Sequence, residues 1–186
     1  MLDTYRALEL GDEKGLLCGK LLADLGMDVI KVEPPGGDKV RNFGPFYHGI
    51  PDSEKSLFWY AYNNNKRGIT LNLQSVTGRM LFKKLVKKMD VVIESFPPGY
   101  MKSLGLGYDN LRRLNPDLIM VSITPFGQDG PYKEYKTTDI VNMALGGFMF
   151  LTGDEDRPPL RVSFPQSCFF AGSEAASAVS LALFHR

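Results

Sequence analysis

Two stretches of this chain share a layout in which a β-rich run ends in a loop of glycine and proline. Residues 90–99 read DVVIESFPPG, and residues 118–131 read LIMVSITPFGQDGP. A short helical stretch lies between them, so together they form a strand–loop–helix–strand–loop unit. In open α/β sheets, the ligand crevice forms at the carboxyl ends of the strands, where such loops emerge. The two stretches therefore predict an α/β fold and place a ligand at these strand ends.

The first 33 residues predict a β-α-β unit. A strand is expected at residues 5–10 and a second one at residues 28–33, where Pro34 and Pro35 end it. The helix expected between them, at residues 15–26, is indicated by the helical spacing of Leu17, Leu21, Leu22 and Leu25. Such a unit predicts parallel strands that are joined by a right-handed crossover.

Further elements are expected along the rest of the chain. A third strand is predicted at residues 68–73. Ser75 is expected to cap a helix whose apolar face carries Leu81, Phe82, Leu85, Val86 and Met89. Asp109 is expected to cap a short helix at residues 110–114. The later segments predict a helix at residues 139–148, a short strand at 160–164 and a last helix from 170 onward.

The bulk composition is that of an ordinary globular domain. The chain has 186 residues, with 44% hydrophobic and 23% charged residues, and its net charge of +1 gives no case for a nucleic-acid or anionic-membrane partner. Two cysteines are too few for a disulfide framework, which favours a reducing, cytoplasmic location. The N-terminus shows no signal-peptide pattern, and no apolar run approaches the roughly 20 residues needed to span a bilayer.

Several well-known site motifs are missing. Residues 36–41 (GGDKVR) do not match the P-loop pattern, and residues 11–15 (GDEKG) do not match G-x-G-x-x-G. The two histidines are far apart and the cysteines form no C-x-x-C pair, so no metal is expected. No G-x-S-x-G element supports a serine hydrolase. Residues 63–67 (NNNKR) can hold phosphates or form a solvated loop.

Taken together, the segments resemble the family III CoA-transferases, the CaiB/BaiF type whose relatives include formyl-CoA transferase and α-methylacyl-CoA racemase. The matching phrases are LADLG (22–26), VIKVE (29–33), GD with Arg41 (37–41), NKR (65–67), ESFPPG (94–99), LGLGY (104–108), LNPDLI (114–119), FGQDGPY (126–132) and DI (139–140). Members of the family are longer. Residues 1–186 are therefore expected to be the N-terminal part of the large, CoA-binding domain, with the C-terminal half of the full-length protein absent.

The resemblance implies a Rossmann-like open, mostly parallel sheet flanked by helices, and dimers with interlocked subunits. It also implies coenzyme A or an acyl-CoA as substrate, bound across the strand ends, and a small carboxylic acid as its partner in the reaction. Four positions match family residues that line the CoA site: Leu71, Ser95, Phe96 and Lys136. Phosphate or adenine-side contacts are expected from Lys66, Arg67 and Lys102.

The chain departs from the family pattern at the nucleophile. The family has an aspartate in a phrase of the type P-V-R-V-G-x-P-x-x-D-L-x-x-G. Here, residues 159–172 read PLRVSFPQSCFFAG, so Cys168 stands at the aspartate position. Smaller departures are Pro34 and Ser103, where the family often has basic residues, and Ser95, where an Asn is usual. The racemase branch pairs the aspartate with a histidine, at a position where this chain has Thr138.

The change to cysteine alters the chemistry. In the family, the carboxylate attacks an acyl-CoA thioester, and the CoA thiolate then attacks the aspartyl carbonyl to give an aspartyl-CoA thioester. A cysteine has no carbonyl and cannot carry CoA as a thioester. Cys168 is then either a buried residue without chemistry or a reactive thiol in a different mechanism. The other carboxylates are weak candidates to replace the nucleophile, because Asp139 is expected to cap a helix and residues 154–156 lie in a solvated turn.

Three functional hypotheses follow. The chain is a non-catalytic CoA-transferase subunit in a hetero-oligomer, paired with a paralogous subunit that keeps the aspartate. Alternatively, it is an enzyme that uses Cys168 or a displaced carboxylate. Or it is a CoA- or acyl-CoA-binding protein without turnover. The assembly is expected to be a homo-oligomer or a hetero-oligomer with an aspartate-containing paralogue.

Overall fold

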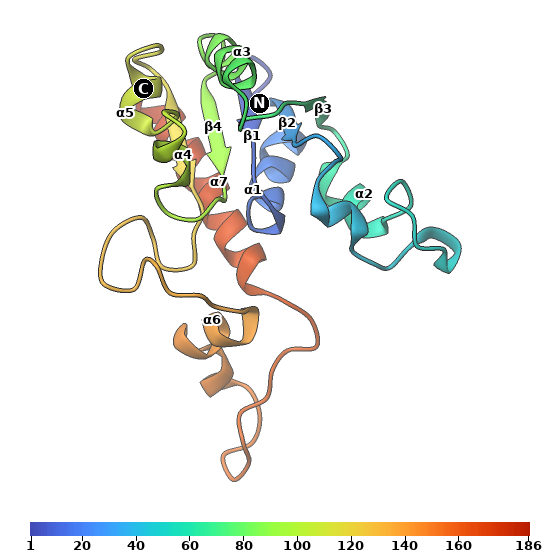
Figure 1. Cartoon of the computed structure of the whole chain (residues 1–186). Helices are drawn as coiled ribbons and strands as arrows, with labels where there is room; N and C mark the ends of the chain where they lie inside the picture. Colours follow the sequence, from blue (N-terminus) through green and yellow to red (C-terminus); the bar gives the residue numbers. More distant parts are fainter.

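The computed structural model describes residues 1–186, which fold around one parallel sheet (Figure 1). The five strands are β1 (Arg6–Glu9), β2 (Asp28–Glu33), β3 (Arg67–Thr70), β4 (Val91–Glu94) and β5 (Ile119–Ser122). Their order across the sheet is β3-β2-β1-β4-β5, and every neighbouring pair is parallel. The predicted fold class, an open parallel α/β sheet flanked by helices, is confirmed.

Helices cover both faces of this sheet. The α-helices are α1 (Glu13–Asp24), α2 (Leu57–Asn63), α3 (Val76–Val86), α4 (Tyr100–Ser103), α5 (Tyr108–Arg112), α6 (Asp139–Leu145) and α7 (Ser167–His185). Three short 3-10 helices are η1 (Lys39–Asn42), η2 (Tyr47–Gly49) and η3 (Phe148–Leu151).

The alternation of side chains along the strands builds two cores. Ala7, Val91 and Ile93 point to the face that α1 and α7 cover. Leu8 and Val92 point to the opposite face, where α3, α4 and α5 pack. Successive strand residues point to opposite faces, so strands that are apolar throughout are buried on both sides. The result is a three-layered arrangement of helices, sheet and helices.

The chain path defines where a ligand crevice opens. From β1 the chain builds outward to β2 and β3, and it then returns to place β4 on the other side of β1. The carboxyl ends of β1 and β4 are therefore the topological switch point of the sheet. The segment after β5, which contains α6, extends beyond this edge and returns as α7 (Figure 1).

Several expected elements agree with the structure. The second strand has the predicted bounds, Asp28–Glu33. Ser75 caps α3 as predicted, because its side chain accepts the N–H of Gly78 at 2.9 Å. Leu81 was expected on the apolar face of this helix, but 45% of the residue is exposed, so this expectation was wrong. The buried stripe of α3 runs through Phe82 and Val86, and Leu81 lies one position off that stripe.

Other expectations were wrong in detail. Residues 160–164 form no strand, because they lie in an exposed loop between two prolines with no neighbouring strand to pair with. The helix expected at 110–114 begins at Tyr108, and Gly107 rather than Asp109 occupies its N-cap position. The helix expected at 139–148 ends at Leu145, since Gly147 adopts a positive φ of 78° and a separate 3-10 turn follows.

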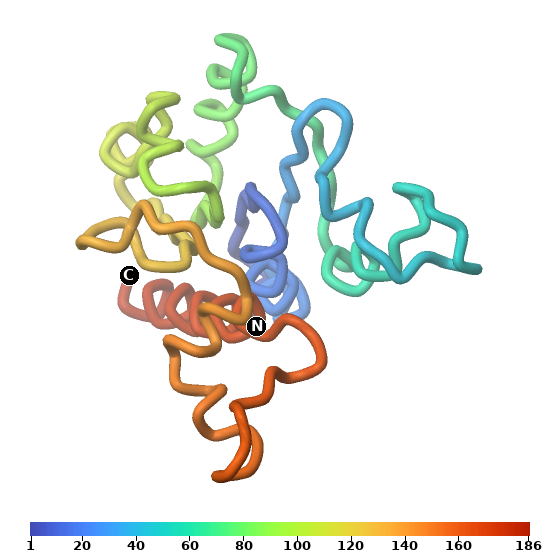
Figure 2. Tube along the Cα trace, turned by 60° about the horizontal axis from the view of Figure 1, so that its bottom comes forward, coloured from blue at the N-terminus to red at the C-terminus, as the bar shows by residue number.

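Helix α7 corrects the expectation about apolar runs. It has 19 residues and a mean hydropathy of 1.4, so by length and composition alone it is able to cross a membrane. A single helix of this kind is weak evidence for a membrane span, because the core helix of a soluble protein can have the same length and hydropathy. Here, Ala176 and Val179 are buried against α1, and Figure 2 shows the two helices side by side.

Candidate functional site

A cleft of about 450 Å³ opens at the carboxyl ends of β1, β2, β3 and β4, and we term it the switch-point cleft. It is lined by Leu10, Gly11, Asp12, Val32, Glu33, Pro34, Gly37, Asp38, Lys39, Leu71, Asn72, Leu73, Gln74, Phe96 and Tyr100. Two of the predicted CoA-lining residues, Leu71 and Phe96, are thus brought together. The cleft lies where the strand order of an open α/β sheet predicts a ligand.

Aromatic and aliphatic side chains form one wall of this cleft. The rings of Phe96 and Tyr100 are in contact, with centroids 4.7 Å apart. The Gln74 side-chain amide donates a hydrogen bond to the Tyr100 hydroxyl. Leu71 packs beside them against the core. Such a wall suits a planar or apolar part of a ligand, with an amide and a hydroxyl at its border.

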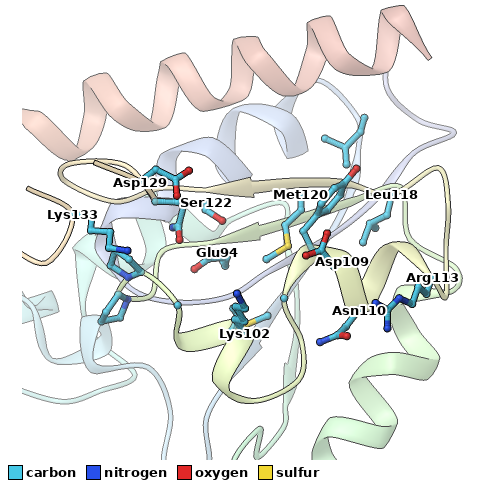
Figure 3. Close-up of a pocket in the computed structure, with 18 of the residues that line it drawn as sticks. Glu94, Lys102, Asp109, Asn110, Arg113, Leu118, Met120, Ser122, Asp129 and Lys133 are labelled. Atoms are coloured by element: carbon cyan, nitrogen blue, oxygen red, sulfur yellow. The ribbon is translucent and has the colours of Figure 1, made fainter. Parts of the chain in front are cut away.

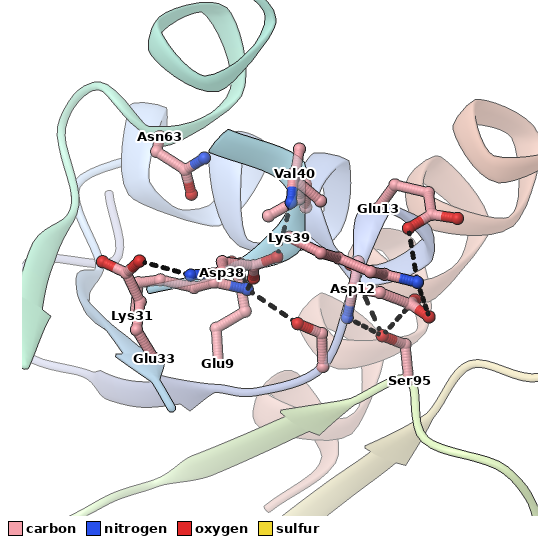
Figure 4. Close-up of polar contacts among 12 residues, drawn as sticks. Glu9, Asp12, Glu13, Lys31, Glu33, Asp38, Lys39, Val40, Asn63 and Ser95 are labelled. Atoms are coloured by element: carbon pink, nitrogen blue, oxygen red, sulfur yellow. Dashed lines mark hydrogen bonds and ion pairs between the residues drawn. The ribbon is translucent and has the colours of Figure 1, made fainter. Parts of the chain in front are cut away.

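Ser95 supports the cleft from behind. Its side-chain oxygen accepts the N–H of Asp12 at 2.8 Å and donates to the Asp12 carboxylate at 2.9 Å (Figure 4). The residue is fully buried, so in this structure it joins the loops after β1 and β4 and does not face a ligand. One residue further on, the N–H of Phe96 donates to the Glu94 carboxylate at 2.8 Å. These bonds fix the backbone that carries the Phe96 ring.

The close approach of these two loops requires a glycine. Gly11 has a φ of +100°, and a Cβ added there would lie 2.2 Å from the Ser95 side-chain oxygen and 2.8 Å from its backbone nitrogen. No other residue type fits this position without moving the β4 loop.

A buried ion-pair network underlies the cleft. The Lys31 ammonium lies 3.0 Å from the Asp38 carboxylate and 3.4 Å from Glu9, and it donates to the carbonyl of Gly11 at 3.2 Å. Burial alone would lower the pKa of Lys31, but the charges of Glu9 and Asp38 raise it above its ordinary value. Lys31 is therefore a fixed cation that holds Gly11 and Asp38 in place at the cleft.

Lys66 and Arg67, the predicted phosphate or adenine-side contacts, are not among the residues that line the switch-point cleft. The side chain of Lys66 is 1% exposed, pairs with Glu9 at 2.7 Å and donates to the carbonyl of Leu16 at 3.0 Å. Arg67 forms two hydrogen bonds to Asp28, at 2.8 and 2.6 Å, at the amino ends of β3 and β2. Both basic groups have internal partners, and neither lines the switch-point cleft, although the Lys66 ammonium contacts Glu9, the last residue of β1.

A second, larger cleft of about 810 Å³ lies between α4, α5, β5 and the loop after β5 (Figure 3). Its charged side chains are of both signs: Glu94, Lys102, Asp109, Arg113, Asp129, Lys133 and Glu134. The predicted contact Lys102 is located here, on the far side of the Pro97–Gly99 loop from the switch-point cleft. Lys136 is exposed in the loop before α6 and lines neither cleft.

Cys168 lines a third and smaller pocket, of about 340 Å³, which we term the Cys168 pocket. It is lined by Lys14, Ile123, Thr124, Pro125, Phe126, Asn142, Leu145, Gly146, Ser167, Cys168 and Ala171. Burial, with a smaller contribution from the negative charge of Glu13, raises the pKa of the Cys168 thiol to about 11. The group at the nucleophile position is therefore a protonated thiol at neutral pH.

The other carboxylates near this position have structural roles. One oxygen of Asp139 accepts the backbone N–H groups of Gln166 and Ser167, both at 2.7 Å. Burial would raise the pKa of Asp139, but these hydrogen bonds outweigh it and hold the pKa below its ordinary value. The expectation that Asp139 caps a helix is corrected in one respect, since it caps the start of α7 and not its own helix. Residues 154–156 are exposed in a turn.

Sequence reasoning missed part of the site. Asp12, Lys39, Gln74 and Tyr100 line the switch-point cleft, and none of them was singled out. The signal was available for Asp12, which lies in the short loop after the first strand. Lys39 belongs to the glycine-rich segment after β2, where the sequence offered only a general anion-binding pattern. No group of three or more His, Cys, Asp or Glu side chains is arranged to hold a metal ion.

The parallel sheet, with a cleft at its switch point, defines a Rossmann-like α/β fold. The family model of CoA-transferase family III matches residues 8–186. The chain therefore belongs to the family III CoA-transferases.

Named relatives and a solved structure agree with this membership. The chain is 42% identical to succinyl-CoA–D-citramalate CoA-transferase of Chloroflexus aurantiacus, covering 100% of this chain and 46% of the relative. It is 38% identical to the BbsE subunit of succinyl-CoA:(R)-benzylsuccinate CoA-transferase of Thauera aromatica, covering 97% and 44%. A CaiB/BaiF family protein from Brucella suis superposes with a TM-score of 0.90 at 39% identity, covering 100% and 49%. The chain spans about half the length of the relatives it matches.

Proposed function

We propose that this chain is the CoA-binding, non-catalytic component of a CoA-transferase that moves CoA between an acyl-CoA and a carboxylic acid. Residues 1–186 would then form the N-terminal part of the large domain. The observation that carries the proposal is Cys168, which occupies the nucleophile position with a pKa of about 11. CoA-transfer through a protein thioester needs a carbonyl on the protein, and a thiol supplies none.

The remaining polar groups near Cys168 favour the same conclusion. One carboxylate oxygen of Asp139 accepts hydrogen bonds at the N-terminus of α7, and its other oxygen lies 3.9 Å from Arg161. A thiol with a raised pKa is a poor nucleophile at neutral pH, which argues against an enzyme that acts through Cys168. The displaced-carboxylate alternative has no free candidate among the residues singled out from the sequence.

CoA is proposed to lie along the carboxyl edge of the sheet. Leu71 and Phe96 both line the switch-point cleft, where a planar ring or the pantetheine chain would find an apolar wall. The Cys168 pocket lies beyond the loop after β1, since Lys14 of α1 lines it. In this arrangement the acyl end of the ligand would approach Cys168 and the nucleotide end would remain in the switch-point cleft.

The catalytic aspartate is proposed to come from a paralogous subunit. One relative is named as a subunit, BbsE, of a succinyl-CoA-dependent transferase. A hetero-oligomer of two related chains would let one subunit lose its nucleophile while the complex keeps its activity. Succinyl-CoA is the proposed donor, because both relatives described above are named as succinyl-CoA-dependent transferases.

The test is a transfer assay of the full-length protein with succinyl-CoA and a panel of carboxylates, alone and with a copurifying paralogue. The proposal expects transfer only when the paralogue is present. CoA transfer by the full-length protein alone would overturn the proposal that this chain is a non-catalytic subunit. Tight CoA binding with no paralogue and no transfer would instead support a CoA-binding protein without turnover.

A further inference from the structure

Each carboxylate that lines the switch-point cleft has its own cation. Asp38 pairs with Lys31 at 3.0 Å, and Glu33 accepts two hydrogen bonds from Arg41, at 2.7 and 2.9 Å. Asp12 pairs with Lys14. Each of these carboxylates therefore lies beside a cation other than Lys39, and the acidic residues in the lining do not by themselves exclude an anionic ligand.

Lys39 is the remaining charged group in the cleft. It is the one Lys or Arg among the lining residues, and its side chain is 62% exposed. Its ammonium lies 3.5 Å from Asp12 and 3.4 Å from Glu13, and Figure 4 shows both contacts. An ammonium has three donors, so Lys39 can keep these contacts and still bind another anion.

The backbone of Lys39 is held firmly although its side chain is exposed. Lys39 begins η1, and the preceding residue Asp38 caps this turn by accepting the N–H of Val40 at 3.0 Å. The N–H of Asp38 itself donates to Glu33 at 2.9 Å, and its carboxylate is fixed by Lys31. The Lys39 ammonium therefore extends from a rigid base toward the loop after β1.

We infer that Lys39 binds the phosphate-bearing end of coenzyme A in the switch-point cleft, opposite the Phe96–Tyr100 wall. The inference rests on the proposed CoA binding of this chain. An aromatic wall in the same cleft as a single available ammonium suits a ligand that joins a planar ring to phosphates. Lys102 and Lys133 line the other cleft and do not compete for this position.

The test measures ligand affinity of the full-length protein, with its copurifying partner if there is one, by isothermal titration calorimetry. The ligands are CoA, 3′-dephospho-CoA and pantetheine. We expect Lys39→Met to weaken CoA binding about 10-fold or more and to leave pantetheine binding unchanged, because only the phosphates face the ammonium. Lys39→Arg should retain most of the affinity. Lys84→Met, which removes an exposed charge from α3, is the matched control.

Different results would overturn the role of Lys39 and the proposed CoA binding itself. If the wild-type protein binds CoA and Lys39→Met binds it equally well, the role of Lys39 is overturned. An equal loss of CoA and pantetheine binding in Lys39→Met would also overturn it, since that pattern indicates a damaged cleft. If the wild-type protein binds no CoA, the proposed function itself fails. The difference between CoA and 3′-dephospho-CoA shows whether the 3′-phosphate or the diphosphate is the group bound.

Discussion

The carboxylate of Asp139 accepts hydrogen bonds from both the backbone N–H and the hydroxyl of Ser167, at 2.7 and 2.8 Å. The first N–H groups of a helix have no partner within the helix, so Asp139 caps α7 from a different helix. Cys168 is the next residue, and its position at the carboxyl edge of the sheet therefore depends on this cap. The cap therefore helps to fix the residue that the family resemblance places at the nucleophile position.

Replacing Asp139 with alanine should lower the free energy of unfolding by about 1–2 kcal/mol, as the loss of a helix cap does. Asp139→Asn keeps an acceptor oxygen and should cost less. Urea unfolding of the full-length protein measures both, with Asp154→Ala in the exposed turn as the control. Equal stability of Asp139→Ala and the wild type would contradict the capping role.

The Asp139 cap should also depend on pH. Its pKa is depressed in the folded protein, so the cap stabilises the fold fully above the unfolded pKa of an aspartate, about 3.9. The stabilisation is lost as the pH falls through the lower folded pKa. The stability gap between wild type and Asp139→Ala should therefore be constant near neutral pH and narrow below about pH 4. A gap that widens in acid would be inconsistent with this sign.

Cys168 should be alkylated slowly at neutral pH. With a pKa of about 11, the thiolate fraction at pH 7 is about 1 in 10,000, and the rate should rise about tenfold per pH unit toward pH 11. Iodoacetamide labelling of the native full-length protein, followed by peptide mass spectrometry, measures the rate against a cysteine peptide. Cys18, which is fully buried with a pKa of about 12, is the internal control. Labelling of Cys168 as fast as the peptide at pH 7 would restore the reactive-thiol hypothesis.

Lys66 should stabilise the folded protein by neutralising the buried carboxylate of Glu9. Lys66→Met leaves Glu9 buried with only Lys31, 3.4 Å away, and should destabilise the protein by about 3–5 kcal/mol. Adding Glu9→Gln to Lys66→Met should recover part of this loss, because the uncompensated charge is removed. Urea unfolding of the single and double variants gives the coupling, with Lys84→Met as a surface control. Strictly additive effects would show that the pair is not coupled.

Gly11 offers a test of the loop contact behind the switch-point cleft. Gly11→Ala should cost about 2–4 kcal/mol, since it combines a positive φ with a clash against Ser95. Gly36→Ala is the matched control, because Gly36 also has a positive φ, +92°, but has no atom within 4 Å of an added Cβ. The control should cost only about 1–2 kcal/mol. Similar losses in both variants would mean that the Ser95 contact adds nothing.

The fold was largely predictable from local sequence because its strands carry clear stop signals. The bounds of β2 were predicted correctly, since the prolines after Glu33 cannot continue a central strand. The strand expected at residues 160–164 was wrong because a β-rich run becomes a strand only where a neighbour can pair with it. Pairing is a property of the whole sheet, and no local pattern encodes it.

The site was less predictable than the fold. Leu71 and Phe96 were placed by resemblance, and they do share a cleft. The burial of Lys66 was not predictable, because a basic residue in an asparagine-rich run has the composition of a surface loop. Its burial depends on Glu9, which is distant in the sequence and lies on a different strand. The role proposed for Lys39 likewise depends on tertiary contacts, because other cations pair with the carboxylates of the cleft.

The most direct test of the central claim is to find which chain carries the covalent intermediate. The full-length protein and its paralogue would be incubated with succinyl-CoA, quenched and analysed by peptide mass spectrometry. We predict a CoA thioester on an aspartate of the paralogue and an unmodified Cys168 peptide from this chain. A succinyl group on Cys168, or a CoA thioester on any carboxylate of this chain, would contradict the assignment of a non-catalytic subunit.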